Sequence, residues 1–173
     1  MPHINIEIKA RCKNPGRIKK ILKSQNADFK GIDYQVDTYF KVPYGRLKLR
    51  EGNIENYLIF YERKDSVRPK KSSVSLFENK KGSSLKGILD NALGKLIVVD
   101  KKREIYFIEN VKFHLDKVKD LGTFVEIEAI DRDNSIGRQR LYRQCEYYMK
   151  LLNIMPEDLI SSSYSDLLLD KQS

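Results

Sequence analysis

The stretch Ile4-Asn5-Ile6-Glu7-Ile8-Lys9-Ala10-Arg11 alternates apolar residues at even positions with polar or charged residues at odd positions. The same alternation recurs in Arg46-Leu47-Lys48-Leu49-Arg50, in Lys112-Phe113-His114-Leu115-Asp116 and in Phe124-Val125-Glu126-Ile127-Glu128. A period of two indicates β-strands with one apolar and one polar face. If these strands share one sheet, its polar face carries both carboxylates that can bind a metal and bases that can bind an anion.

The length and charge of the chain limit the classes of protein to which it can belong. Its 173 residues, 40% of them hydrophobic, are enough for a real core, and we expect a single domain over residues 1–173. The 33 Lys and Arg exceed the 24 Asp and Glu, for a net charge of +9, which favours an anionic partner. A nucleotide, a polyphosphate, a nucleic acid or an acidic membrane would each satisfy that charge.

Cys12 and Cys145 are the only cysteines, and no CxxC spacing occurs, so the sequence predicts neither a disulfide scaffold nor a thiol-bound zinc site. The first residues contain no apolar signal core, and no stretch reaches the roughly 18 to 20 apolar residues needed to cross a bilayer. We therefore expect a cytoplasmic protein with no membrane partner.

The order of strand and helix patterns indicates an α+β fold. Helices are expected after Asn14, over residues 84–93, from residue 134 or 135 to about 153, and within residues 156–169. Strand patterns cover residues 4–11, 30–41, 45–51, 55–64, 72–77, 95–108, 111–117 and 122–130. This succession predicts an eight-stranded antiparallel β-barrel, a tunnel with a polar interior, flanked by α-helices.

The same face of successive strands collects an unusual set of charges. An ordinary sheet turns its charges to water, and that interpretation suits each strand taken alone. A solvated face, however, does not need so many arginines, nor carboxylates concentrated on two strands. In a closed barrel, a small interior can hold a ligand while helices cover the apolar exterior. The interior would then be lined by Glu7, Lys9, Arg11, Lys48, Arg50, Tyr61, Arg63, Lys101, Arg103, His114, Asp116, Glu126 and Glu128.

Carboxylates and bases on one enclosed face predict a site for a metal-bound polyanion. Glu126 and Glu128 are two residues apart on one strand, so they point the same way and can supply oxygen ligands to Mg²⁺ or Mn²⁺. Lysines and arginines on facing strands can bind phosphate oxygens through charge-assisted hydrogen bonds. A triphosphate bridged by a metal ion matches both halves of the face.

Several motifs, in order along the chain, resemble those of a known family. They are Ile6-Glu7-Ile8-Lys9, Gly45-Arg46-Leu47-Lys48-Leu49-Arg50, Val99-Asp100-Lys101-Lys102-Arg103, and His114-Leu115-Asp116 followed by Leu121-Gly122-Thr123-Phe124-Val125-Glu126-Ile127-Glu128. With Asp37-Thr38-Tyr39-Phe40 and the tail Ser163-Tyr164-Ser165-Asp166-Leu167-Leu168, the chain resembles the CYTH superfamily of triphosphate tunnel enzymes, most closely its class IV adenylyl cyclases.

The resemblance implies a tunnel that binds a divalent metal through acidic residues and a triphosphate through a basic lining. Metal binding and catalysis would fall to Glu7, Glu126 and Glu128, with Asp116 assisting directly or through water. The triphosphate would be held by Lys9, Lys48, Arg50, Arg63, Lys101 and Arg103. Lys71 also matches a family lysine, although the adjacent Lys70 leaves the register open. His114 is either a hydrogen-bond donor in the tunnel or a structural residue.

One position departs from the family's opening motif, Glu-x-Glu-x-Lys. This chain has Asn5-x-Glu7-x-Lys9, so a neutral amide replaces the first carboxylate and would weaken metal binding if that position is a ligand. Lys48 also stands where many relatives have an arginine, so a compact ammonium charge replaces a planar guanidinium group that can donate two parallel hydrogen bonds. The sequence therefore leaves open whether the protein catalyses a reaction.

The resemblance gives three hypotheses for the function. The first is a Mg²⁺- or Mn²⁺-dependent enzyme that converts ATP to cyclic AMP and pyrophosphate. The second is a thiamine- or inorganic-triphosphatase, and the third is a non-catalytic protein that binds a nucleotide or polyphosphate. Nucleic-acid binding is disfavoured because the bases lie on the ligand-facing side of the strands and not on an exterior stripe. The sequence leaves the oligomeric state open, a homodimer included.

Overall fold

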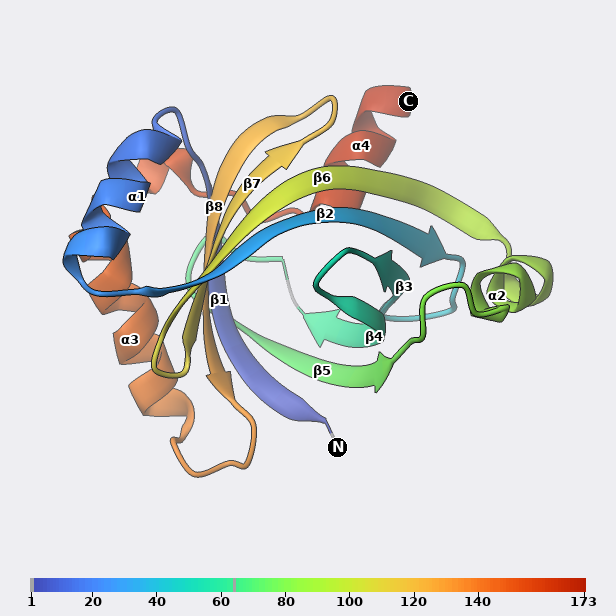
Figure 1. Ribbon diagram of the computed structural model, residues 1–173, viewed down its shortest axis with the longest axis horizontal. Coiled ribbons are helices and arrows are strands. Elements are labelled where there is room, and N and C mark those ends of the chain that lie inside the picture. Colours follow the sequence, from blue (N-terminus) through green and yellow to red (C-terminus); the bar gives the residue numbers. More distant parts are fainter. Residues whose placement is uncertain (1, 64) are drawn as a thin grey trace.

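In the part of the chain that the computed structural model describes, residues 2–63 and 65–173, eight antiparallel strands close into a barrel (Figure 1). Their bounds are β1 His3–Arg11, β2 Asp28–Phe40, β3 Arg46–Glu51, β4 Asn56–Arg63, β5 Lys70–Glu78, β6 Lys95–Ile108, β7 Val111–Val118 and β8 Gly122–Asp131. Around the barrel the strands follow the order β1-β5-β4-β3-β2-β6-β7-β8. The predicted eight-stranded antiparallel barrel is confirmed.

The described residues also form four α-helices and one short 3₁₀ helix. These are α1 Pro15–Ser24, α2 Leu85–Leu93, α3 Arg138–Leu151, η1 Pro156–Asp158 and α4 Tyr164–Gln172. The sequence signal for α1 has a clear physical basis. The Asn14 side chain accepts a hydrogen bond of 3.1 Å from the backbone N–H of Arg17, and Pro15 stands in the first turn.

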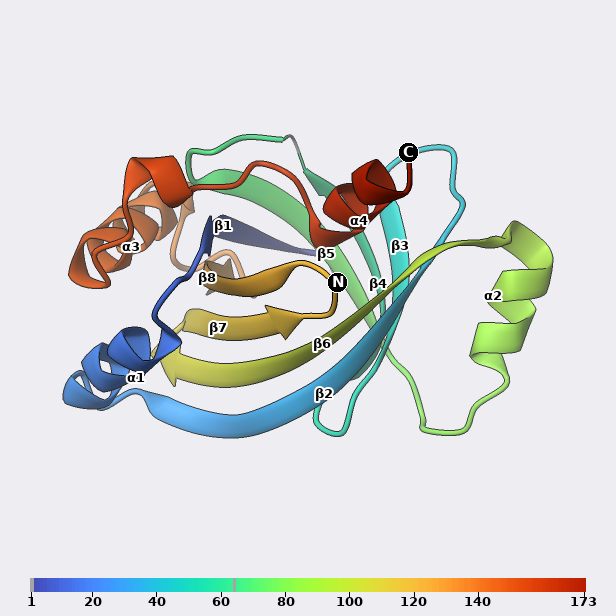
Figure 2. The same ribbon diagram turned by 90° about the horizontal axis from the view of Figure 1, so that it is seen from above.

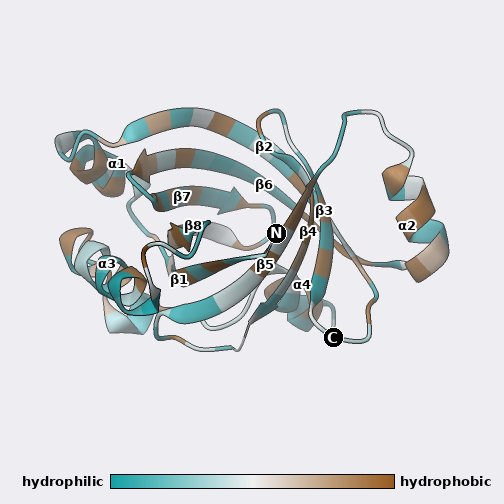
Figure 3. Ribbon diagram, turned by 90° about the horizontal axis from the view of Figure 1, so that it is seen from below, coloured by the Kyte–Doolittle hydropathy of each residue, from teal (hydrophilic) through white to brown (hydrophobic). Residues whose placement is uncertain are grey.

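The barrel turns its polar face inward, and its apolar outer face is covered by helices on one side. Ile6 of β1 and Phe113 of β7 are buried on this outer face, in one apolar cluster with Leu22 of α1 and Leu141 of α3. All four side chains are 0% exposed. Figure 3 shows hydrophilic and hydrophobic residues alternating along the strands. Helices covering an apolar exterior are what a barrel with a polar interior requires.

The two cysteines are buried and form no disulfide, as the sequence predicts. The Cys145 thiol donates to the backbone carbonyl oxygen of Ile6 over 3.0 Å, which ties α3 to β1. Burial raises the pKa of Cys145 to about 12, so the thiol stays protonated. Both side chains lie in the apolar cluster between helices and barrel.

The segment before α4 crosses one end of the barrel. Leu159 forms an isolated bridge with Ala10 of β1, and the N–H of Ile160 donates to the carbonyl oxygen of Lys9 over 2.9 Å. Tyr164, the first residue of α4, then packs against Phe124 of β8 with ring centroids 4.9 Å apart. The chain's C-terminal part therefore supplies a wall at this end of the interior.

The helix α2 stands away from the barrel, beyond the ends of β2 and β6 (Figure 2). None of its residues is buried, and Ile88 is 58% exposed. Across the residues that the structure describes, every helix is too short or too polar to cross a lipid bilayer. The cytoplasmic location stays a prediction.

The unequal burial of the helices predicts unequal effects on stability. Leu22→Ala or Leu141→Ala should lower the free energy of unfolding by about 2 to 5 kcal/mol, because each removes a fully buried side chain and leaves a cavity. Ile88→Ala on α2 is the matched control and should change it by less than about 0.5 kcal/mol. Urea unfolding measures the three values. Equal losses in all three variants would contradict the assignment of the core.

Candidate active site

A cavity occupies the polar interior of the barrel, and every strand contributes to its wall. It encloses about 990 Å³, including the solvent at its openings. The residues predicted for the site that line it are Glu7, Lys9, Lys48, Arg50, Lys101, Arg103, His114, Glu126 and Glu128. The structure therefore brings together most of the acids and bases that the alternating pattern assigns to one face, whereas Arg11 is exposed and does not line the cavity.

One buried carboxylate, that of Asp37 on β2, organises the basic wall. Arg50, its register partner on β3, donates two hydrogen bonds of 2.9 Å to it through Nε and Nη2. The Nζ atoms of Lys101 and Lys48 lie 2.7 and 3.3 Å from Asp37 Oδ2. Three cations share one anion, which leaves a surplus of positive charge at the cavity wall.

Burial and the neighbouring charges together shift the pKa values in this cluster. Burial opposes the ionisation of Asp37, but Arg50, Lys101 and Lys48 outweigh it and hold the pKa of Asp37 well below its usual range. Burial, which the attraction of Asp37 does not offset, lowers the pKa of Lys101 to about 7, and repulsion from Arg50 and Arg103 adds to the drop. An anion bound beside Lys101 would favour its charged form.

Asp116 of β7 supports Arg103 of β6 and is not part of the cavity lining. Its oxygens accept hydrogen bonds from Arg103 Nε and Nη2 at 2.7 and 2.8 Å, and the Tyr164 hydroxyl donates to Oδ2 over 2.7 Å. The third guanidinium nitrogen, Nη1, takes no part in the two hydrogen bonds to Asp116. Asp116 therefore positions Arg103, and its predicted assistance in metal binding stays a prediction.

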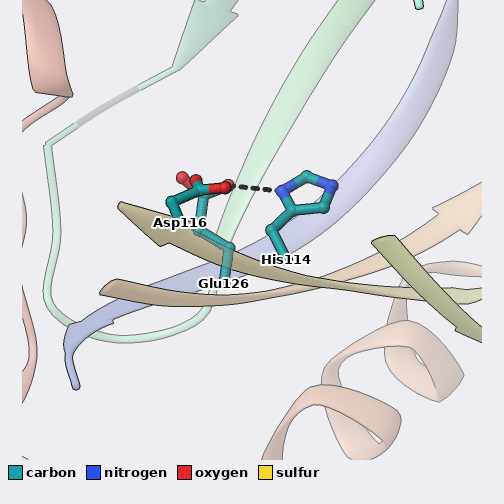
Figure 4. Close-up of side chains that lie close together, drawn as sticks. All are labelled: His114, Asp116 and Glu126. Carbon is teal, nitrogen blue, oxygen red and sulfur yellow. Dashed lines mark hydrogen bonds and ion pairs between the residues drawn. The ribbon is translucent and has the colours of Figure 1, made fainter. Parts of the chain in front are cut away.

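The acidic wall is built around His114 of β7 and Glu126 of β8 (Figure 4). Burial, with the charges of Arg103 and Lys112, lowers the pKa of His114 to about 4, so the ring is neutral. Its Nδ1 therefore donates to Glu126 Oε2 over 3.2 Å. Burial disfavours charge on Glu126, but Lys9, 3.5 Å away, and this hydrogen bond hold the pKa of Glu126 well below its usual range.

Asn5 of β1 and Glu128 of β8 make a second contact on the acidic wall. The Asn5 amide nitrogen donates a hydrogen bond to Glu128 Oε1. Burial raises the pKa of Glu128 to about 7, and the charges of Glu7 and Glu126 contribute to the rise against an opposing Lys112. A positive charge placed beside Glu128 would therefore favour its ionised form.

The donor set of the acidic wall fits a divalent cation. His114, Asp116 and Glu126 each place a ligand atom within 4.8 Å of the others (Figure 4). Asn5 Oδ1 and His114 Nε2 are buried acceptors without a hydrogen-bond partner in residues 2–63 and 65–173. Unsatisfied acceptors beside carboxylates match a cation, and the oxygens of Glu126 and Glu128 suit Mg²⁺ or Mn²⁺.

The structure corrects one predicted phosphate ligand. Lys71 is exposed on the outer face of β5, so the expectation that it lines the tunnel is wrong. The inward position belongs to Lys70, which is 4% exposed and lies opposite Glu7 in the β1–β5 register. Strand alternation allows only one of two adjacent residues to face the interior. The side chain of Arg63, another predicted ligand, lies outside the described part of the chain.

Sequence reasoning assigned no role to four residues that shape the site: Asp37, Glu55, Lys112 and Tyr164. Lys112 stands two residues before His114, and Asp37 stands two residues before Tyr39, so each pair faces the same side of its strand. The alternation therefore contained a signal for both Lys112 and Asp37. Glu55 directly precedes β4 and shares the inward alternation of Tyr57 and Ile59, so the pattern contained a signal for it as well. Tyr164 is 48 residues from Asp116, and no local pattern could indicate their hydrogen bond.

Comparison with known proteins agrees with the barrel and its ionic interior. The profile of the CYTH domain family matches residues 3–150. The chain belongs to the CYTH domain family.

Individual relatives cover nearly the whole chain. A Methanocaldococcus jannaschii protein named a putative adenylate cyclase is 22% identical over 173 residues, spanning 95% of this chain and 98% of its own. A solved Pyrococcus horikoshii protein is 26% identical with a TM-score of 0.77, covering 94% of this chain and 98% of that one. A Hippeastrum protein, described as a putative adenylyl cyclase with a dominant triphosphatase activity, shares the fold at 16% identity, with a TM-score of 0.60 over 98% of this chain and 95% of that one.

The lowered pKa of Lys101 predicts a pH-dependent stability. The unfolded chain holds a proton on Lys101 up to a pKa of 10.5, whereas the folded protein releases it near pH 7. Between about pH 7 and pH 10 the unfolded state therefore binds more protons. The stability of the wild type should rise with pH relative to Lys101→Met, by up to about 1.4 kcal/mol per pH unit.

Urea unfolding of both proteins across this pH range measures the slope. Lys102→Met, one residue along β6 on the opposite face, is the matched control and should show no slope relative to the wild type. A difference between wild type and Lys101→Met that stays constant with pH would contradict the assignment.

Proposed function

We propose that this protein is an enzyme that uses Mg²⁺ or Mn²⁺ to act on a triphosphate, most like a class IV adenylyl cyclase. The observation that supports this proposal is that a basic wall and an acidic wall line the same cavity. Three cations share Asp37 on one wall, and Glu126 and Glu128 stand on the other. The basic wall calls for an anion and the acidic wall for a cation, and a metal-bound triphosphate supplies both.

Phosphate binding would use the donors that the internal ion pairs leave available. Asp116 holds Arg103 along its Nε and Nη2 edge, which leaves Nη1 for a phosphate oxygen. Lys101 donates one hydrogen bond to Asp37, and an ammonium group has three N–H donors. Because carboxylates fix both side chains before the ligand arrives, binding would cost little additional side-chain entropy.

The metal would be held by Glu126 and Glu128, with Glu7 facing them from β1 and the unsatisfied Asn5 Oδ1 and His114 Nε2 beside them. When bound, Mg²⁺ or Mn²⁺ would neutralise charge on the triphosphate oxygens and favour an in-line displacement. Lys9, between Glu126 and the Tyr164 ring, would keep Glu126 ionised for this role.

Two reactions fit the same arrangement. Attack of the ribose 3′-hydroxyl on the α-phosphorus of ATP releases cyclic AMP, pyrophosphate and a proton, whereas attack of water on the terminal phosphorus releases phosphate. Tyr57, Ile59 and Leu76 give the cavity an apolar side that suits the nucleoside part of ATP. The name of the M. jannaschii relative supports the cyclase, and the activity described for the Hippeastrum protein supports hydrolysis.

Asn5 favours a further candidate, a non-catalytic protein that binds a nucleotide or polyphosphate. The residue stands where the family's opening motif has its first carboxylate, and its amide engages one oxygen of Glu128. Such a protein would keep the basic wall and bind a triphosphate without needing the metal.

Parallel assays with ATP, thiamine triphosphate and inorganic triphosphate, each with and without Mg²⁺ or Mn²⁺, test the proposal. Cyclic AMP and pyrophosphate from ATP would establish the cyclase, and phosphate from any of the three would establish a triphosphatase. Tight triphosphate binding that ignores metal, without any product, would contradict the enzyme and favour the binding protein.

Glu126→Gln and Glu128→Gln should each abolish metal-dependent turnover. We expect losses of at least about 100-fold, because even the outer partners of metal ligands typically cost roughly 10- to 100-fold when they are changed. Glu104→Gln, on the outer face of β6 where Glu104 pairs with Lys19 at 2.7 Å, is the matched control. Unchanged turnover in both tunnel variants, with unfolding curves like the wild type, would refute the metal assignment.

Asn5→Glu should make the stability of the protein depend on metal. Without metal, the new carboxylate would face Glu128 and lower the melting temperature, by roughly 2 to 4 °C for each kcal/mol of repulsion in a domain of this size. Mn²⁺ between the two carboxylates should restore it. Asn5→Gln, equal in length but neutral, is the control for calorimetry with Mn²⁺ or with a chelator. If Mn²⁺ stabilises both variants equally, the amide does not stand in for a lost ligand.

A further inference from the structure

Glu55 lies in the turn between β3 and β4, and its carboxylate is bound by donors from three other strands. Oε1 accepts hydrogen bonds from Arg50 Nη1 at 3.1 Å and from Gln35 Nε2 at 3.0 Å. Oε2 accepts one from Lys112 Nζ. Two cations and an amide thus surround an anion that belongs to the protein itself. Because both of its oxygens face these donors, Glu55 is not a further metal ligand.

The turn that carries Glu55 is held firmly in place. The buried carboxylate of Asp33 accepts the backbone N–H groups of Ile54 and Glu55, each over 2.9 Å. Gly52 passes so close to Asp33 that a Cβ at this position would lie 2.5 Å from Oδ1. These contacts fix the backbone beneath the Glu55 side chain. The Glu55 side chain therefore projects from a fixed backbone and lines the cavity wall.

Arg50 connects Glu55 to the rest of the basic wall. Its Nε and Nη2 bind Asp37, while its Nη1 binds Glu55, so one guanidinium spans two carboxylates. Asp37 in turn contacts Lys101 over 2.7 Å. Contacts through Asp37 and Glu55 thus link Lys101, Arg50 and Lys112 into what we call the cationic row. Glu55 stands between the last two members of this row.

We propose that Glu55 sets the length of the phosphate chain that the tunnel accepts, because it takes the donors that a phosphate beyond the third would use. The inference rests on the proposed function, since it concerns the number of phosphates in the substrate that the same site accepts. A longer chain that follows the cationic row past Arg50 would meet a carboxylate in a largely enclosed site, where like charges repel strongly. A triphosphate bound to Lys101 and Arg103 that ends before Glu55 would avoid this repulsion.

Calorimetric titration with inorganic triphosphate and inorganic tetraphosphate tests the inference. The measured quantity is the ratio of the two dissociation constants, in the wild type and in Glu55→Gln, which keeps the shape and removes the charge. The ratio should shift toward tetraphosphate by about tenfold or more in Glu55→Gln, a modest part of the repulsion expected between charges a few ångströms apart.

Two further variants separate a local effect from a general change in charge. Glu51→Gln removes the same charge at the end of β3, where Glu51 is half-buried outside the cavity lining and pairs with Lys86 at 3.1 Å, and it should leave the ratio unchanged. The double variant Glu55→Gln with Lys112→Met should lose most of the gain, because Lys112 is a donor that Glu55→Gln makes available. An unchanged ratio in Glu55→Gln, or an equal shift in Glu51→Gln, would overturn the inference.

Glu55→Asp covers the case in which Glu55→Gln does not fold. It keeps the charge but withdraws it by one methylene from Arg50 and Lys112, so the ratio should shift the same way by a smaller factor. No shift in Glu55→Asp would then overturn the inference. Failure of the wild type to bind inorganic triphosphate, with or without Mn²⁺, would instead overturn the proposed function.

Discussion

The attraction of three cations to the single buried carboxylate of Asp37 is the interaction on which the interior of the barrel depends. Buried charges are costly unless they are paired, and Lys48, Arg50 and Lys101 all contact Asp37, while Arg50 also contacts Glu55. Asp37 makes the cluster stable enough to exist before a ligand arrives. Burial lowers the pKa of Lys101, repulsion from Arg50 and Arg103 adds to the drop, and an anion bound beside these cations would relieve that repulsion.

The same constraint explains why the barrel is inverted relative to an ordinary globular sheet. Charges can be concentrated inside only if acids and bases face one another, as they do between β1, β7 and β8 on one wall and β2, β3 and β6 on the other. The apolar residues of these strands must then point outward, where α1 and α3 cover those of β1, β7 and β8. Tyr164 links the C-terminal segment to this interior through its hydrogen bond to Asp116.

The strands and the inward parity could be predicted from the sequence because alternation is a local property, and most of the predicted lining residues do line the cavity. What could not be predicted depends on contacts between distant segments. Lys70 and Lys71 were indistinguishable until the register of β5 against β1 was known. Asp116 stands two residues after His114, on the same face of β7, yet its oxygens accept hydrogen bonds from Arg103 and Tyr164. Glu55 contacts Arg50 of β3 and Lys112 of β7, and no local pattern could indicate these contacts.

A crystal structure with Mn²⁺ and a non-hydrolysable ATP analogue would test most directly whether the two walls together hold one metal-bound triphosphate. The arrangement described above predicts phosphate oxygens bound by Lys101 and Arg103 and a metal ion bound by Glu126 and Glu128 inside the same cavity. Phosphates bound outside the barrel, or a metal ion that does not contact Glu126 or Glu128, would contradict it.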